Sequence, residues 1–146
     1  MNTKKAMFDK SGDSHFDNIS AFIKSMRGSD PDATVFYLAR ALNAGEDPMF
    51  LARRIAICAS EDVGMANSNA LVVANSALQA IHQIGMPEAR ITLAQATEFV
   101  ARAKKSNRAI MAIDNAINDI KSGLDYLPPK HLRDAHYKDA KKYGFG

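Results

Sequence analysis

The chain has 146 residues, which is enough for a domain with a hydrophobic core. Hydrophobic residues make up 47% of it, a share that excludes a disordered chain, and no apolar run approaches the roughly 18 residues of a membrane-spanning helix. The formal net charge of +3 permits contact with nucleic acid but does not by itself indicate it. A single cysteine excludes a framework of internal disulfide bonds and is typical of a reducing cytoplasm.

Two helices are predicted in the first third of the chain. Ser14, with Asp17 three residues later, forms a variant capping box for a helix that ends at Gly28. Asp30 followed by Pro31 is a second start signal, because an N-cap residue precedes a proline in the first turn. No sustained alternation of apolar and polar residues favours strands.

A central helix is predicted over residues 47–64, and the rest of the chain is interpreted around it. Asp47 is a good N-cap, and Gly64 stands where a left-handed C-cap residue belongs. One broad apolar arc is predicted to face the core: Leu51, Ala52, Ile55, Ala56, Cys58 and Ala59. Phe50 and Ile57 lie among the charged residues outside that arc, which indicates contact from a second side, such as another subunit.

Three further helices complete the prediction of a compact all-α bundle of about six helices. Helix four, capped by Asn67 or Ser68, carries two adjacent apolar stripes, which predict burial on two sides. A capping box of Thr92 and Gln95 is predicted to start helix five. Helix six is expected to open at residues 106–107 and end at Gly123. Its isoleucines recur at helical spacing: Ile110, Ile113, Ile117 and Ile120.

The domain boundaries follow from this pattern. Residues 1–12 are interpreted as a linker, residues 13–123 as the helical domain, and residues 124–146 as a basic tail that is expected to be poorly anchored. Within that tail, residues 130–143 form a candidate short helix.

The search for catalytic or metal-binding motifs finds no nucleotide loop of the Gly-x-x-x-x-Gly-Lys or Gly-x-Gly-x-x-Gly kind and no His-Glu-x-x-His. His131 and His136 are five residues apart, a spacing that does not place both on one helical face for a metal. Cys58 lies on the apolar arc, so a small buried hydrophobic residue is favoured over a nucleophile. We therefore expect no catalytic, cofactor-binding or metal-binding residue in this chain.

The adjacent carboxylates of Glu61 and Asp62 are unfavourable near a helix C-terminus, so a compensating arginine is expected. Arg54 lies two turns away, at about 10 Å along the axis, and a partner from elsewhere is therefore needed. A structural ion-pair network is favoured over one that joins two subunits. The residues predicted as candidates for an oligomer interface are Phe50, Arg53, Arg54, Ile57 and Glu61.

The densest basic cluster spans residues 104–108, between helices five and six. A solvated turn is the default interpretation. The sharper alternative is contact with nucleic-acid phosphates beside a helix N-terminus, with Lys104, Lys105 and Arg108 as the candidates.

Several of these stretches, taken together, resemble a known family. The stretches in question are residues 12–33 (GDSHFDNISAFIKSMRGSDPDA), 44–48 (AGEDP), 52–54 (ARR), 59–64 (ASEDVG), 84–89 (IGMPEA), 93–96 (LAQA) and 105–107 (KSN). In this order they resemble the C-terminal domain of the MgsA/RarA family, the replication-associated recombination proteins, which are relatives of the Werner helicase-interacting protein. The likeness covers about residues 9–122.

The resemblance implies a clamp-loader-like AAA+ ATPase that acts in DNA replication and recombination at stalled forks and assembles into homotetramers. ATP and Mg²⁺ would be bound by an ATPase core and lid that precede this collar-like helical domain. The full-length parent would be a DNA-dependent ATPase, cytoplasmic and associated with the nucleoid, that also contacts other replication proteins and no membrane.

The sequence departs from the family pattern at both ends. The ATPase module is absent, and residues 127–133 (LPPKHLR) stand where the family has Val/Ile-Pro-x-His-Leu-Arg. We therefore expect a non-enzymatic C-terminal oligomerisation domain with no cofactor of its own. The alternative is a helical module that binds nucleic acid through the basic turn.

Overall fold

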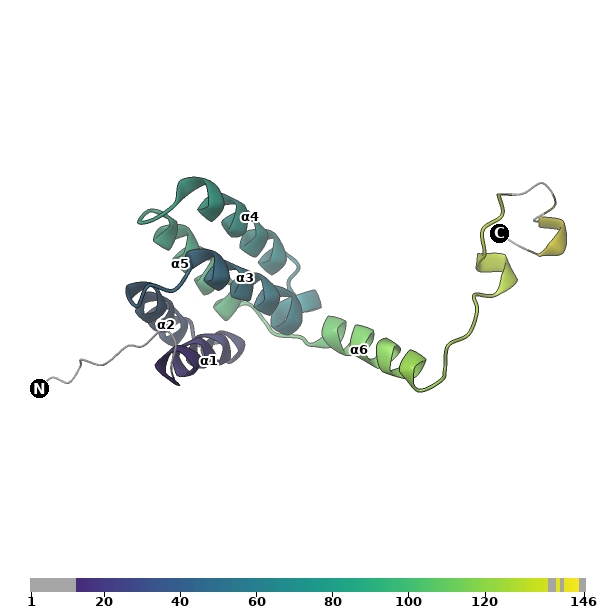
Figure 1. The fold of residues 1–146 in the computed structure, drawn as a ribbon, viewed down its shortest axis with the longest axis horizontal. Helices are drawn as coiled ribbons and strands as arrows, with labels where there is room; N and C mark the ends of the chain where they lie inside the picture. The colour runs from purple at the N-terminus through teal and green to yellow at the C-terminus, as the bar shows by residue number, and fades with distance from the viewer. Residues whose placement is uncertain (1–12, 137–138, 140, 145–146) are drawn as a thin grey trace, which may run out of the picture. The chain divides into compact units, whose positions relative to one another are not determined.

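The computed structural model describes residues 13–136, 139 and 141–144, and the prediction for residues 1–12 lies outside this range. Its described part is all-α, with six α-helices and no strand, which confirms the predicted fold class (Figure 1). The helices are α1 (Asp13–Arg27), α2 (Pro31–Asn43), α3 (Pro48–Cys58), α4 (Asn69–Ile84), α5 (Ala89–Arg102) and α6 (Arg108–Lys121). The chain divides into two compact units, one up to Ala112 and one from Ile113, and each is described by itself.

Helices α1 and α2 pack against each other, and the turn between them is set by local hydrogen bonds. The Ala33 N–H donates to the side chain of Asp30 over 3.1 Å, and the Thr34 hydroxyl donates to the Asp30 carbonyl over 2.6 Å. Asp30 therefore caps α2 as predicted, with Pro31 at the first helical position.

Helix α3 begins as the sequence predicts, but it does not end as a regular α-helix. Asp47 caps it by accepting a hydrogen bond from the Met49 N–H over 3.0 Å. After Cys58 the chain makes one π-helical turn, η1 (Ala59–Val63), and then a 3₁₀ turn, η2 (Gly64–Ala66). Gly64 has φ 49°, and a Cβ there would lie 3.1 Å from the carbonyl oxygen of Ser106, so the position needs glycine.

Helices α4 and α5 form the other side of the bundle, and two predictions about them are wrong. Helix α5 starts at Ala89, a turn before Thr92, because backbone bonds from Ala89 to Gly85 (2.9 Å) and from Ile91 to Glu88 (3.0 Å) already form the first turn. On α4, the chain fully buries one face only, which takes two residues from one predicted stripe and one from the other, while Leu71 and Ile84 stay exposed. That face consists of Ala70, Ala74, Ala77 and Ile81.

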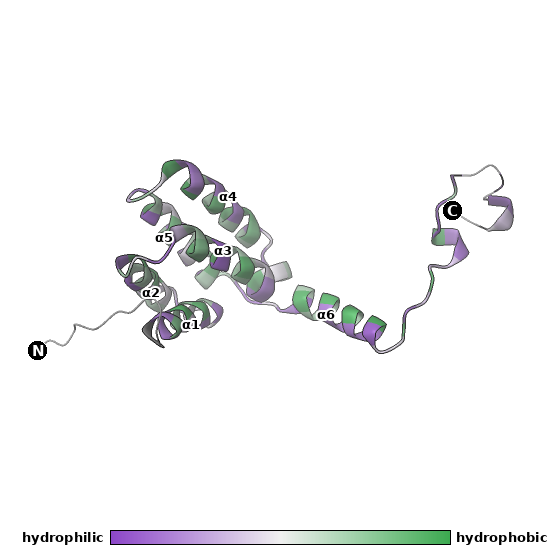
Figure 2. Cartoon of the chain, in the orientation of Figure 1, coloured by the Kyte–Doolittle hydropathy of each residue, from purple (hydrophilic) through white to green (hydrophobic). Residues whose placement is uncertain are grey.

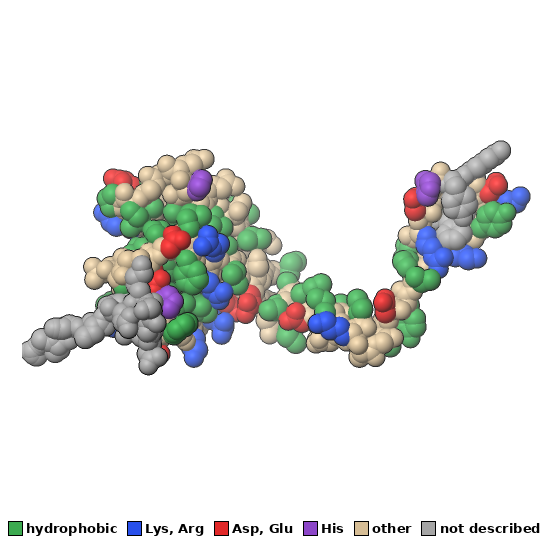
Figure 3. Space-filling view, in the orientation of Figure 1, with side chains coloured by type: hydrophobic (Ala, Val, Ile, Leu, Met, Phe, Trp, Pro, Cys, Tyr) green, Lys and Arg blue, Asp and Glu red, His purple; other side chains and the backbone are tan. Residues whose placement is uncertain are grey.

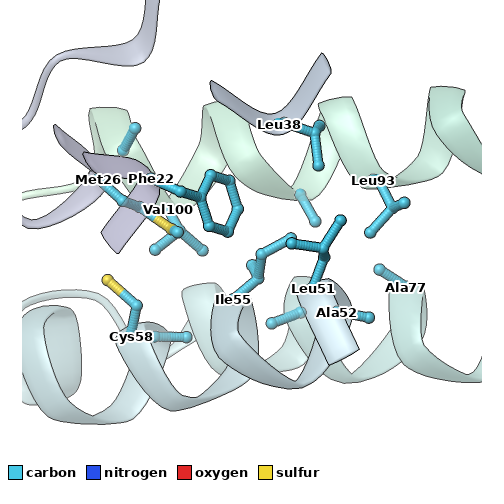
Figure 4. Close-up of a cluster of buried hydrophobic side chains, with 14 of the residues drawn as sticks. Phe22, Met26, Leu38, Leu51, Ala52, Ile55, Cys58, Ala77, Leu93 and Val100 are labelled. Carbon is cyan, nitrogen blue, oxygen red and sulfur yellow. The ribbon is translucent and has the colours of Figure 1, made fainter. Parts of the chain in front are cut away.

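The hydrophobic core lies between α1, α2, α3 and α5, with α4 covering α3 and α5 through its alanines. Figure 4 shows side chains from several helices converging there, including Phe22 from α1, Leu51 from α3 and Val100 from α5. All three are fully buried. The small buried alanines of α4 and α5 let the helix backbones approach closely.

Helix α6 forms with a hydrophobic and a hydrophilic side (Figure 2), and none of its residues is buried. Beyond it, the described residues of the candidate helix over 130–143 form two 3₁₀ turns, η3 (Lys130–Leu132) and η4 (Lys141–Tyr143), and no α-helix. Within the described part of the chain, no helix has the length and hydropathy needed to cross a membrane.

Candidate functional site

An exposed apolar stripe runs along α6. Ile113, Ile117 and Ile120 expose 56%, 40% and 51% of their surface. Figure 3 shows hydrophobic side chains at the surface of the segment that contains α6. The helix is nevertheless well terminated. The Arg108 N–H donates to the Ser106 hydroxyl over 3.3 Å, and the Leu124 N–H donates to the Asp119 carbonyl over 2.9 Å, past Gly123 with φ 106°. A contiguous exposed apolar face on a stable helix marks a surface for interaction.

Four of the five interface candidates lie on α3, in different environments. Ile57 is 42% exposed, and Arg53 is exposed with a guanidinium nitrogen 4.0 Å from Asp47. Phe50 is half-buried and packs against the core. The Nε of half-buried Arg54 has no hydrogen-bond partner among the described residues. Ile57 and Arg53 are therefore exposed at the surface, whereas Phe50 packs partly against the core.

Phe50 and Arg54 border a groove of about 400 Å³ between α1 and α3. Its other lining residues are His15, Phe16, Ile19, Ser20, Ile23, Lys24 and Arg27. The groove combines an apolar floor with cationic side chains and contains no carboxylate.

The arginine that Glu61 and Asp62 require is Arg27, from the end of α1. Its Nε donates to Asp62 Oδ1 over 3.1 Å, and its Nη2 lies 3.9 Å from Glu61 Oε2. The favoured interpretation, a structural ion-pair network, is the one that the geometry shows. The partner is 35 residues away in sequence, and no spacing rule points to it.

Cys58 is buried beside this ion pair, as predicted, and its thiol donates to Asp62 Oδ2 over 3.0 Å. Burial, together with the neighbouring Asp62 carboxylate, raises the pKa of the thiol far above its ordinary value. The sulfur therefore stays protonated, and the role of Cys58 is packing and hydrogen bonding, not nucleophilic attack.

Lys105 is held inside the chain by three hydrogen bonds. Its ammonium donates to the carbonyls of Ala101 (2.9 Å) and Ala103 (2.6 Å) and to the hydroxyl of Ser29 (3.0 Å). Desolvation lowers its pKa from the usual value, with the nearby Cys58 and Asp62 acting in the opposite direction. Since an ammonium has three N–H donors, Lys105 has none left for a phosphate in this conformation.

The rest of the basic cluster has a different environment. Lys104 and Arg108 are exposed, and neither side chain has a partner in the described part of the chain. Phosphate binding by the cluster remains a prediction. Because Lys105 is bonded internally, Lys104 and Arg108 are the remaining candidates for it.

The comparison with known proteins decides the family. The profile of the MgsA AAA+ ATPase C-terminal family matches residues 28–146. The chain belongs to this family. The resemblance inferred from its motifs is thereby confirmed.

Full-length relatives extend the comparison. The chain is 57% identical over 137 residues to an AAA domain-containing protein of Mycobacterium tuberculosis, covering 94% of this chain and 30% of the relative. It is 48% identical over 143 residues to replication-associated recombination protein A of Bacillus subtilis, covering 98% and 34%. It is 43% identical over 143 residues to the protein of the same name in Escherichia coli K12, covering 98% of this chain and 32% of the relative. This MgsA C-terminal chain thus spans about a third of the length of these relatives.

A substitution at Lys105 tests its internal role in this MgsA C-terminal domain. We expect Lys105→Met to lower the free energy of unfolding by about 1–3 kcal/mol, because two carbonyls lose a charged donor. Urea denaturation followed by circular dichroism measures the change.

Lys104→Met is the matched control, and its effect should stay within about 0.5 kcal/mol because Lys104 is exposed. Equal effects of the two substitutions would contradict the assignment of Lys105 to the fold.

Proposed function

We propose that this chain is the oligomerisation domain of an AAA+ ATPase that acts in DNA replication and recombination, and that it assembles into homotetramers. Membership of the MgsA C-terminal family and the names of the relatives, AAA domain-containing protein and replication-associated recombination protein A, support the first part. ATP and Mg²⁺ would be held by other parts of a longer parent, whose ATPase activity would depend on DNA. The domain itself would be non-catalytic.

The observation that carries the assembly role is the uncovered stripe of α6. Three isoleucines on one face of a capped helix, Ile113, Ile117 and Ile120, leave much of their apolar surface in water, at a cost of roughly 25 cal/mol for each Å² that a partner could cover. Covering this face with another copy would regain that free energy.

A second apolar surface, formed by η1, η2 and the start of α4 and adjoining Ala109 in the first turn of α6, supports assembly beyond a dimer. Exposed Met65 and Leu71 line an apolar pocket of about 180 Å³, together with Ala59, Ser60, Gly64, Ser68 and Ala109. Exposed Ile57 lies on the preceding helix. A closed tetramer with two-fold symmetry uses two different interfaces, and this chain offers two apolar surfaces.

The first test is the mass of the chain in solution. We expect light scattering after size exclusion to show a tetramer that dissociates on dilution, and Ile117→Asp to weaken assembly at least about tenfold, because a carboxylate would enter an apolar contact. Ala112→Asp, on the outward side of the same helix, is the control and should leave the mass unchanged. A wild-type chain that stays monomeric at all concentrations would refute the proposal.

The second test addresses the central helix. Because Ile57 is 42% exposed, Ile57→Glu should lower the free energy of unfolding by no more than about 1 kcal/mol while reducing the oligomer mass. Light scattering and thermal melting of the same sample separate the two effects. Cooperative loss of helicity would instead place Ile57 in the core, and an unchanged mass would exclude it from the interface.

Binding of nucleic-acid phosphates is the second candidate function, favoured by the exposure of Lys104 and Arg108. If it operates, the affinity for a labelled DNA measured by anisotropy should fall steeply between low and moderate salt. Lys104→Ala and Arg108→Ala should each reduce the salt slope by about one.

Arg102→Ala is the matched control, because Arg102 already pairs with Glu98 at 3.1 Å. Binding that does not respond to salt, or slopes that are the same in all three variants, would exclude this function.

A further inference from the structure

The apolar residues of α6 follow a heptad repeat. Their spacing alternates between three and four residues in the series Ile110, Ile113, Ile117, Ile120 and Leu124. Positions a and d of a coiled coil have this spacing, and they form a seam that packs against a second helix. The helix itself ends at Lys121, so Leu124 would cap the seam after the turn at Gly123.

One flank of the seam is charged, and the other carries alanines. Asp114 and Lys121 occupy successive e positions on one flank, and Ala109 and Ala116 occupy g positions on the other. Asp114 and Lys121 are exposed, and neither side chain has an ion pair or hydrogen bond among the described residues. They are seven residues apart, or about 10 Å along the axis, so they cannot pair with each other within one helix.

We propose that two copies of this chain pair through α6 in an antiparallel arrangement, with Asp114 of each copy bound to Lys121 of the other. The inference rests on the proposed oligomerisation function and names the surface and the orientation that carry it. In this register, Ile117 of one helix packs against Ile120 of the second copy, and two equivalent ion pairs lie beside the seam.

The charges select the orientation. In an antiparallel pair, e positions of one helix lie beside e positions of the other, so Asp114 meets Lys121 twice. In a parallel pair, e positions lie beside g positions, and here these are Ala109 and Ala116, which offer no charge. The alanine flank also lets the two backbones approach closely. Charge complementarity therefore favours the antiparallel arrangement over the parallel one.

Charge exchange in the full chain tests this pairing directly. Asp114→Lys places two lysines together at each contact, and Lys121→Asp places two aspartates together. We expect each variant alone to weaken association by about tenfold at low ionic strength. An equimolar mixture of the two variants, and the double variant in one chain, should both recover the wild-type mass.

Sedimentation or light scattering over a dilution series provides the readout, and circular dichroism checks that helicity is retained. Asp119→Lys makes the same charge change as Asp114→Lys at an outward position of α6 and should leave association unchanged. The differences should shrink as salt is raised, because exposed ion pairs are screened.

The possible outcomes distinguish failure of the proposed oligomerisation function from failure of the α6 pairing alone. A monomeric wild-type chain would refute the proposed function and the pairing with it. An oligomeric wild type whose mass neither single variant changes would overturn the α6 pairing alone. Weakening by both variants without recovery in the mixture would overturn the antiparallel orientation.

Discussion

The carboxylate and carbonyl of Asp62 hold together three segments that are distant in sequence. Its side chain accepts hydrogen bonds from Arg27 (3.1 Å) and Cys58 (3.0 Å), and its carbonyl accepts one from the Ser106 N–H (2.7 Å). The π-helical turn η1 presents both groups of Asp62 at once. Lys105 adds a second set of bonds next to it. The packing of α1 against the end of α3, and the path of the chain from α5 into α6, depend on this cluster.

The bonds around Asp62 and Lys105 also occupy two of the basic side chains of the domain. Arg27 and Lys105 are committed to acceptors in the same chain. Lys104, Arg108 and the flanking charges of α6 have no partner among the described residues, and neither does the apolar stripe of that helix. In the described chain, Arg27 and Lys105 are therefore bonded internally, whereas Lys104 and Arg108 are exposed to solvent.

Helix α6 spans only about two heptads, and isolated two-stranded coiled coils usually need more. An α6 pair would therefore be weak by itself and would depend on concentration. A second surface around Ile57, Met65 and Leu71 would raise the overall affinity, because copies joined at one interface meet at the other with a high effective concentration.

Sequence alone determined the features that depend on near neighbours: the caps at Asp30 and Asp47, the six helices, the repeat of isoleucines in α6, and the family. Only the tertiary structure decided the partners of Asp62 and Lys105, the start of α5, and the single buried face of α4. A cap or a heptad is a relation between residues a few positions apart, so the pattern is visible in the chain. The bond from Arg27 to Asp62 joins residues 35 positions apart, and which arginine reaches that carboxylate depends on how the helices pack.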